Sequence, residues 1–198
     1  MDSRSNDRRS FLKHTAAVGA GVIGGVALGA APTRGPAPVA AAQGSPEQRL
    51  RELGITLPSP QQPFATLVPA VRSGNMLYTS GHGAPRGSDV RSTGKLGADM
   101  TPEEGQAAAR AVGLNVLATV RNELGSLDNV IRLVKTLGMV NSAPDFTGQS
   151  GVINGFSQLM IDIFGDTAGK GARSAVGMAS LPGGWAVEIE AIFEVREG

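Results

Sequence analysis

The sequence contains no cysteine, which excludes disulfide bonds, thiolate metal ligands and cysteine nucleophiles. It has only two histidines, His14 and His82, so a histidine-rich metal site is excluded as well. Aromatic residues make up 4% of the chain and the net charge is +1. Few side chains could therefore stack on bases, and no strong field would gather nucleic acid. We therefore expect no thiolate or histidine-rich metal site and no nucleic-acid partner.

The chain nevertheless contains enough apolar sequence for one folded domain with additional segments. Hydrophobic residues make up 41% of its 198 residues and charged residues 18%, so a sizeable core can form. We divide the chain into an export signal with a Pro/Ala linker at 1–42, an N-terminal extension at 43–64 and a main domain at 65–198.

Residues 1–42 have the features of a targeting signal. Residues 7–13 (Asp-Arg-Arg-Ser-Phe-Leu-Lys) contain paired arginines, a weakly hydrophobic run follows at 15–31, and the alanines at 40–42 fit a cleavage site. This pattern resembles a twin-arginine signal and predicts export to the periplasm or the outside. The alternative is a transmembrane anchor, for which the Gly-rich run is short and poorly apolar. After cleavage near Ala42 no membrane anchor would remain.

The extension is expected to form one short helix and a stiff connector. Ser45 is a good N-cap, Pro46 suits the first helical position, and Gly54 ends a helix over 45–53. Three prolines between positions 57 and 63 then favour an extended chain.

Two strands joined by a tight turn open the main domain. Residues 65–72 and 76–80 have strand composition, and residues 73–75 (Ser-Gly-Asn) suit a hairpin turn. At the end of the second strand, residues 81–83 (Gly-His-Gly) would let the backbone approach a ligand closely, although a plain turn is the alternative. The polar, Gly-rich residues 86–97 are expected to form an exposed hairpin loop.

Helical spacing of apolar residues predicts two long helices. The first begins at Thr101, which can form a capping box with Glu104, and ends at Gly125. The second covers 147–164 and ends at Gly165.

Three further strands are expected in the second half of the chain. In the strand within 130–140, the residues predicted to share one face are Ile131, Leu133 and Lys135. The last stretch, 171–195, consists of a short strand, a Pro-Gly-Gly turn and a longer strand. In the longer strand, alternation places Val187, Ile189, Ala191 and Phe193 on one face and Glu188, Glu190 and Glu194 on the other.

An arginine, Arg173, stands at the start of that short strand. A cation near acidic residues on rigid strands is what a site for a small carboxylate needs, although a surface salt bridge is the alternative.

The predicted elements define an α+β fold with one mixed sheet and two helices on one of its faces. The other face would expose Tyr78, Ile192 and their neighbours, which are too apolar to leave to water. We therefore expect the chain to form an oligomer.

Three motifs in this order resemble the RidA/YjgF family, also named endoribonuclease L-PSP. They are residues 74–81 (Gly-Asn-Met-Leu-Tyr-Thr-Ser-Gly), 172–174 (Ala-Arg-Ser) and 187–191 (Val-Glu-Ile-Glu-Ala), and the match runs from about Leu57 to Val195. The resemblance implies a chorismate-mutase-like fold, a homotrimer around a barrel-like core, and ligand clefts between subunits. It also implies hydrolysis of imines and enamines of the 2-aminoacrylate type to 2-oxo acids and ammonia, without cofactor or metal.

The resemblance assigns roles to individual residues. Arg173 matches the arginine that holds the substrate carboxylate, and Glu188 the glutamate that positions or activates water. Asn154 matches a polar residue of the cleft, and Ser80 with Gly81 a strand-end pair beside the ligand. His82 could act there as a proton shuttle, because the ordinary pKa of histidine lies near neutrality, although a capped loop histidine is as good an interpretation.

Two positions depart from the family pattern: Leu67 stands where the family has a tyrosine, and Ala175 where it has a cysteine. The sequence leaves three candidate functions for this chain. The first is an imine/enamine deaminase, the second a non-catalytic binder of small carboxylates, and the third, disfavoured by charge and composition, an endoribonuclease.

Overall fold

The computed structural model describes residues 44–197, so the predicted export signal lies outside the described residues. The helices are α1 (Pro46–Glu52), α2 (Pro102–Leu124) and α3 (Gln149–Gly169), with short 3-10 turns η1 (Leu127–Asn129) and η2 (Pro182–Gly184). The strands are β1 (Ala70–Ser73), β2 (Met76–Thr79), β3 (Val130–Asn141), β4 (Ala172–Met178) and β5 (Val187–Val195).

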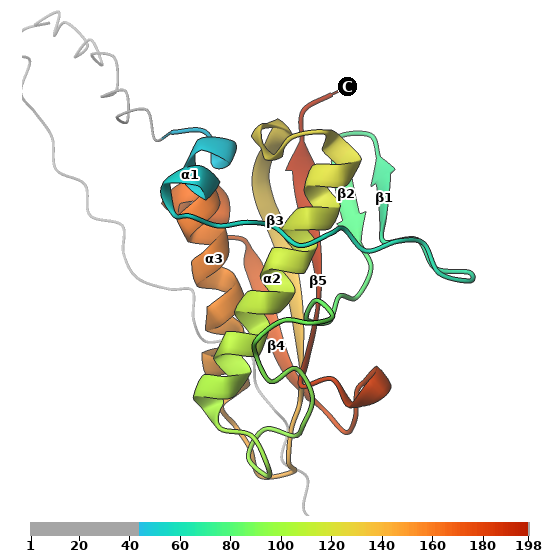
Figure 1. Ribbon diagram of the computed structural model, residues 1–198, viewed down its shortest axis with the longest axis vertical. Helices are drawn as coiled ribbons and strands as arrows, with labels where there is room; N and C mark the ends of the chain where they lie inside the picture. Colours follow the sequence, from blue (N-terminus) through green and yellow to red (C-terminus); the bar gives the residue numbers. More distant parts are fainter. Residues whose placement is uncertain (1–43, 198) are drawn as a thin grey trace, which may run out of the picture. The chain divides into compact units, whose positions relative to one another are not determined.

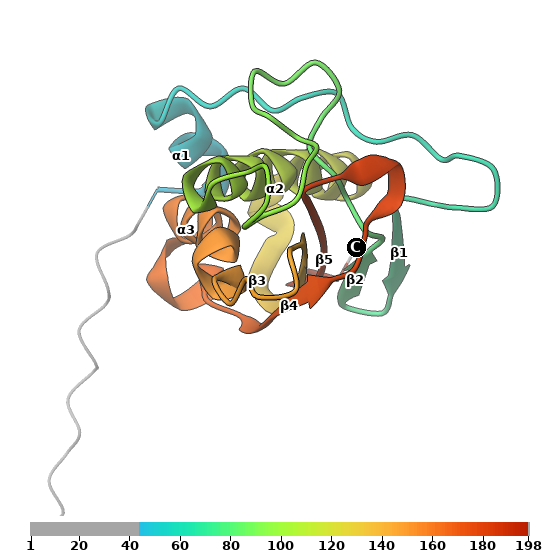
Figure 2. The ribbon, with the colours of Figure 1, turned by 90° about the horizontal axis from the view of Figure 1, so that it is seen from below.

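The five strands form one mixed sheet in the order β1-β2-β5-β3-β4, in which only β3 and β4 run parallel. The long helices α2 and α3 lie on one face of this sheet (Figures 1 and 2). The predicted α+β fold is thus confirmed. The two closing strands are not neighbours, however, because β3 lies between β4 and β5.

The helix ends follow the predicted capping chemistry. The Ser45 hydroxyl accepts the Gln48 N–H at 3.3 Å, and Thr101 forms a complete capping box with Glu104. Gly125 ends α2 with φ of 74°, a left-handed conformation that glycine adopts at little cost. The helix α3 was expected to end at Gly165; it breaks there, with φ of 80° and ψ of 172°, and then continues to Gly169.

The first strand is shorter than predicted. Residues 65–69 are not part of β1, since Ala65 has a positive φ of 51° and the backbones of Phe64 and Leu67 bond to each other in a tight turn. Pro69 cannot donate a ladder hydrogen bond. The regular strand therefore begins at Ala70.

The prediction that Leu133 and Lys135 share a face is wrong. The pairing of β3 with β5 shifts between these residues, so Leu133 lies opposite Phe193 while Lys135 lies opposite Ile192. A β-bulge of this kind inserts one residue and reverses the alternation. Leu133 is consequently buried beneath the helices, and the Lys135 ammonium reaches the other face, where it donates to the Ser174 hydroxyl at 2.9 Å.

The segment expected as an exposed hairpin loop, 86–97, is in part a core segment. Leu96 is fully buried, and its N–H donates to the Asn141 carbonyl at 2.8 Å. The Gly94 N–H donates to Gly184 near the turn before β5. This loop is thereby fixed against the end of the sheet that carries Glu188.

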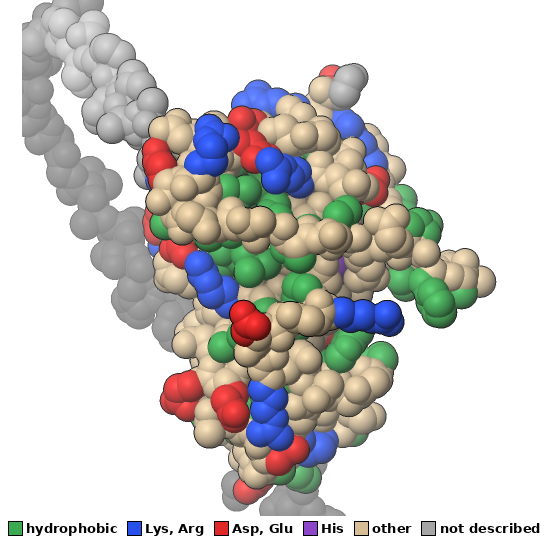
Figure 3. All heavy atoms as spheres, in the orientation of Figure 1, with side chains coloured by type: hydrophobic (Ala, Val, Ile, Leu, Met, Phe, Trp, Pro, Cys, Tyr) green, Lys and Arg blue, Asp and Glu red, His purple; other side chains and the backbone are tan. Residues whose placement is uncertain are grey.

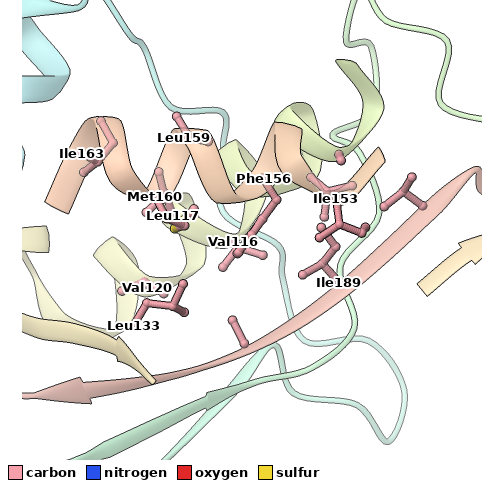
Figure 4. Close-up of a cluster of buried hydrophobic side chains, with 14 of the residues drawn as sticks. Val116, Leu117, Val120, Leu133, Ile153, Phe156, Leu159, Met160, Ile163 and Ile189 are labelled. Atoms are coloured by element: carbon pink, nitrogen blue, oxygen red, sulfur yellow. The ribbon is translucent and has the colours of Figure 1, made fainter. Parts of the chain in front are cut away.

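The core lies between the two long helices and the sheet. Figure 4 shows side chains of α2, α3, β3 and β5 converging there, among them Val116, Phe156, Met160 and Ile189. The helices approach closely because Gly155 lies directly against the backbone carbonyl of Gln106, where no Cβ would fit.

The face of the sheet opposite the helices carries no helix among residues 44–197. Apolar side chains remain exposed on it, including Tyr78 at 43%, Val176 and Met178. A hollow of about 500 Å³ on this face is lined by Tyr78, Lys135, Leu137, Glu190 and Ile192, among others. The predicted open apolar face is therefore present.

Within the described residues, no helix combines the length and the hydropathy that a membrane crossing requires.

Candidate functional site

Arg173 lies on the edge strand β4 and extends toward α3. Its Nη1 donates to the Asn154 side-chain oxygen at 2.8 Å and to the Ser157 hydroxyl at 3.0 Å. No carboxylate within residues 44–197 pairs with it. Two neutral acceptors therefore orient an exposed guanidinium whose remaining donors are available to a ligand.

The structure brings Asn154 to Arg173, while its role in a ligand cleft stays a prediction. Ser157 was not anticipated. It lies three residues after Asn154, one turn along the same helix face, so the spacing of two polar residues was the available signal. We call Arg173, Asn154 and Ser157 the arginine half-site.

Glu188 lies on β5, and its carboxyl group is half-buried against Gly81. Burial, and then the negative charge of Glu190, raise the pKa of the Glu188 carboxyl above its ordinary value of 4.5. Within residues 44–197 this carboxyl has neither a hydrogen-bond donor nor a cation as partner. A carboxyl in this state is suited to accept a proton nearer to neutrality than a free glutamate is.

The residues that follow β2, beside Glu188, are held in place by hydrogen bonds to the segment before β1. The Ser80 N–H donates to the Pro69 carbonyl at 2.8 Å, and the Ser80 hydroxyl donates to the Val68 carbonyl at 2.6 Å. At the next position, a Cβ on Gly81 would overlap the Glu188 carboxyl in its observed position, so glycine lets the two lie in direct contact. We call Ser80, Gly81 and Glu188 the glutamate half-site.

The side chain of His82 is 0% exposed and points beneath the sheet toward α2. One ring nitrogen, Nδ1, lies 2.7 Å from the Ser80 carbonyl oxygen, and the other, Nε2, lies 2.8 Å from the Thr119 hydroxyl. Burial lowers the pKa of His82 below its ordinary value of 6.5, and the bond to Ser80 opposes this shift. The placement does not support a direct contact between this ring and a ligand, because the interior encloses it.

Two further residues hold the turn that follows His82. The Asn115 side chain of α2 donates to the Gly83 carbonyl at 3.0 Å, and the Trp185 ring packs directly against Gly83. Asn115 and Thr119 are four residues apart on α2 and interrupt its apolar stripe. That interruption is the sequence signal that could have identified Asn115 and Thr119.

The two half-sites lie on opposite faces of the sheet within one chain. Arg173 pairs across β3 with Thr136, which is buried beneath the helices, whereas Glu188 pairs with Met139, three residues further along β3. Strand spacing and rise place the Arg173 and Glu188 backbones roughly 14 Å apart. One chain therefore does not bring these two side chains to a common ligand.

The two departures from the family pattern lie near the half-sites. Leu67 is 42% exposed in the tight turn before β1, close in sequence to Val68, which accepts the Ser80 hydroxyl. Ala175 is on the same face of β4 as Arg173, two residues away, and pairs with Gly138. Neither side chain can donate or accept a hydrogen bond, so the surroundings of both half-sites are more apolar than the family pattern implies.

The part of the chain that the structure describes contains no group of three or more His, Asp or Glu side chains placed to bind a metal ion. The chemistry of the half-sites is that of a guanidinium, a carboxyl group and backbone groups. Such groups can bind a carboxylate and move a proton.

Comparison with known proteins identifies similar chains over nearly all of the described region. The family model described as Endoribonuclease L-PSP matches residues 58–195. Protein TCP17 of Trypanosoma cruzi is 46% identical over 155 residues, which cover 78% of this chain and 97% of that protein.

Two solved structures share the fold. One is a protein of unknown function from Agrobacterium tumefaciens, with 42% identity and a TM-score of 0.68 over 76% of this chain and 94% of its own. The other, from Shewanella oneidensis, is described as a candidate endoribonuclease; it has 28% identity and a TM-score of 0.72 over 77% of this chain and 100% of its own.

Proposed function

We propose that this chain, which belongs to the endoribonuclease L-PSP family, also called the RidA/YjgF family, hydrolyses reactive imines and enamines to 2-oxo acids and ammonia. The expected substrates are of the 2-aminoacrylate and 2-iminopropionate type. The observation that carries the proposal is Arg173, an exposed guanidinium that is oriented by Asn154 and Ser157 and has no carboxylate partner among residues 44–197.

Arg173 would bind the substrate carboxylate. Its planar fork matches two carboxylate oxygens, and the bonds to Asn154 and Ser157 fix the plane of the fork before a ligand arrives. Such preorganisation reduces the entropy that binding would otherwise cost.

Glu188 would act on the water. Its raised pKa brings the carboxylate closer to the pH at which a general base is effective. An enamine first takes a proton at its terminal carbon and becomes the iminium, the protonated imine. Water attacks the iminium carbon and gives a proton to Glu188, forming a neutral carbinolamine. Glu188 returns this proton to the amino group, the carbon–nitrogen bond breaks, and the hydroxyl proton passes to the departing ammonia, which leaves the 2-oxo acid and ammonium.

The site would lie between two copies of the chain, because one copy keeps the arginine and glutamate half-sites on opposite faces of the sheet. We propose a homotrimer that covers the open apolar face around Tyr78 and Val176. Exposed Phe64 and Leu67, in the tight turn before β1, would be covered in the same assembly.

The test is release of 2-oxo acid and ammonia from iminopropionate generated enzymatically in the assay. The variant Arg173→Ala should lower kcat/KM by about 100-fold or more, because the carboxylate loses a bidentate charged partner. Arg173→Lys should retain only part of the activity, since an ammonium cannot replace the fork.

Arg121→Ala serves as the matched control, because this arginine instead pairs with Glu47 at 2.8 Å. It should keep the wild-type rate. An unaccelerated reaction with the wild-type chain, or equal rates for wild type and Arg173→Ala, would contradict the proposed activity.

A non-catalytic binder of small carboxylates is the second candidate. It is favoured by Leu67 and Ala175, which take polar groups away from the surroundings of the half-sites. Calorimetric titration with 2-oxobutanoate separates the two: binding that depends on Arg173, without turnover of imine, would select the binder.

An endoribonuclease has little support from the charge distribution. Figure 3 shows acidic and basic side chains intermixed on the helix face, with no extended basic patch. Nucleic-acid binding relies on clustered cations along the backbone path. If cleavage activity toward a labelled RNA persists through purification and is lost in Arg173→Ala, this function would be supported.

Export by the twin-arginine route stays a prediction.

A further inference from the structure

The proposed hydrolysis leaves one buried titratable group without a role. His82 is 0% exposed, yet it directly follows the Ser80–Gly81 pair of the glutamate half-site. An apolar side chain of similar size would fill this space without the cost of burying two ring nitrogens. Both nitrogens are instead used, one on the strand end and one on α2.

The bonds of His82 define its tautomer. The Ser80 carbonyl oxygen can only accept, so Nδ1 at 2.7 Å must carry a proton. In the neutral ring Nε2 is then an acceptor and receives the Thr119 hydroxyl at 2.8 Å. The ring thus connects a side chain of α2 to one particular backbone carbonyl.

The orientation of the Ser80 carbonyl determines the direction of the Gly81 N–H. The peptide between Ser80 and Gly81 is trans, since the described residues contain no cis peptide bond, and in a planar trans peptide C=O and N–H point in opposite directions. While His82 holds the Ser80 carbonyl, the Gly81 N–H is directed away from the buried ring. Among residues 44–197 this N–H has no acceptor, and the Glu188 carboxyl lies against the same glycine.

We propose that His82, supported by Thr119, is a positioning residue that locks the Ser80–Gly81 peptide so that the Gly81 N–H is presented to an oxygen of a bound small carboxylate beside Glu188. The proposal takes its class of ligand, a small carboxylate, from the proposed function. It does not require that the chain converts this ligand into a product. His82 acts from beneath the sheet and does not touch the ligand. On the neighbouring strand β5, His82 pairs with Ile189, and the charged groups on either side of Ile189 are Glu188 and Glu190. The side chains that α2 contributes around His82 and the following turn include the neutral Asn115 and Thr119.

The experiment compares two substitutions of His82 in the full chain. His82→Asn places an amide nitrogen near the position of Nδ1 and keeps a donor for the Ser80 carbonyl, whereas His82→Phe fills the space without any donor. The readouts are the ¹⁵N shifts of the His82 ring, the amide resonance of Gly81, and the Kd for 2-oxobutanoate from titration of that resonance.

We expect a neutral ring with the proton on Nδ1, and a Gly81 amide that shifts on addition of 2-oxobutanoate. His82→Phe should weaken binding about 10-fold, while His82→Asn should stay within about threefold of wild type, as expected for one buried hydrogen bond lost or kept. Leu127→Ala is the stability control: it removes the fully buried side chain at the start of η1 and should lower Tm without changing Kd.

Several results would overturn the positioning role: a proton on Nε2 in the neutral ring, equal Kd values for His82→Phe and wild type, or a Gly81 amide that does not respond to bound 2-oxobutanoate. Failure of the wild-type chain to bind 2-oxobutanoate would overturn it together with the carboxylate site. Binding with the expected order of variants but without imine hydrolysis would contradict the proposed enzymatic function alone.

Discussion

Glu188 carries a carboxyl group that no residue between 44 and 197 pairs with, and its pKa in the folded chain lies above 4.5. The folded state therefore binds this proton more tightly than the unfolded state does. As pH rises from about the ordinary pKa through the raised one, the free energy of unfolding falls, and the ionised carboxylate costs stability above that window. A residue placed at such a cost is a candidate for function rather than for stability.

The variant Glu188→Gln should consequently have a higher Tm than wild type at neutral pH. The gain should be a fraction of a kcal/mol, because water screens a half-exposed group, and it should disappear below about pH 4. Thermal unfolding across this pH range measures it. Glu194→Gln on the same strand face is the control and should change little; a lower Tm for Glu188→Gln at neutral pH would instead indicate a cationic partner supplied by another copy.

At the scale of elements, the helix layer depends on one close contact between α2 and α3. Gly155 lies against the Gln106 carbonyl, which belongs to the backbone and cannot rotate away. Ser157 and Asn154 flank this contact on α3, so the spacing of the two helices also sets the position of the arginine half-site.

The variant Gly155→Ala should therefore destabilise the fold by about 1–3 kcal/mol through overpacking. Gly151→Ala on the same helix is the matched control, because nothing lies within 4 Å of its added methyl group. It should be neutral or stabilise the fold by up to about 1 kcal/mol, as alanine does in a helix. Denaturant unfolding of both variants tests the contact, and equal effects would show that the helices tolerate separation at this point.

At the scale of the whole molecule, the opposite placement of the half-sites makes a prediction about mixed assemblies. If each site takes Arg173 from one copy and Glu188 from another, the inactive variants Arg173→Ala and Glu188→Gln should complement each other when they are co-expressed. Random mixing leaves both residues intact in about a quarter of the sites, so activity should return to about a quarter of the wild-type value.

The control mixes Arg173→Ala with a chain that carries both substitutions, which cannot rebuild an intact site and should stay inactive. Mixed assemblies of the two single variants that remain inactive, with both chains present in one oligomer, would show that the two residues do not act at a shared site.

Local sequence was sufficient for the start of α1 and for both ends of α2. Capping by Ser45, Thr101 and Gly125 involves only residues a few positions away, so it could be predicted from the sequence alone. The structure places Asn154 beside Arg173, and Gly81 beside Glu188. The family resemblance had assigned all four residues to one cleft, which stays a prediction.

Other features were decided only by tertiary structure. The bulge that turns Lys135 to the open face, and the insertion of β3 between β4 and β5, depend on pairing between strands far apart in the sequence, which alternation within one strand does not contain. The burial of His82 depends likewise on α2, which packs against the ring through Thr119. The sequence by itself determined the family, the order of the main helices and strands, and the caps at the start of α1 and at both ends of α2. The three-dimensional packing decided which face each reactive group occupies, because faces and burial are set by non-local contacts.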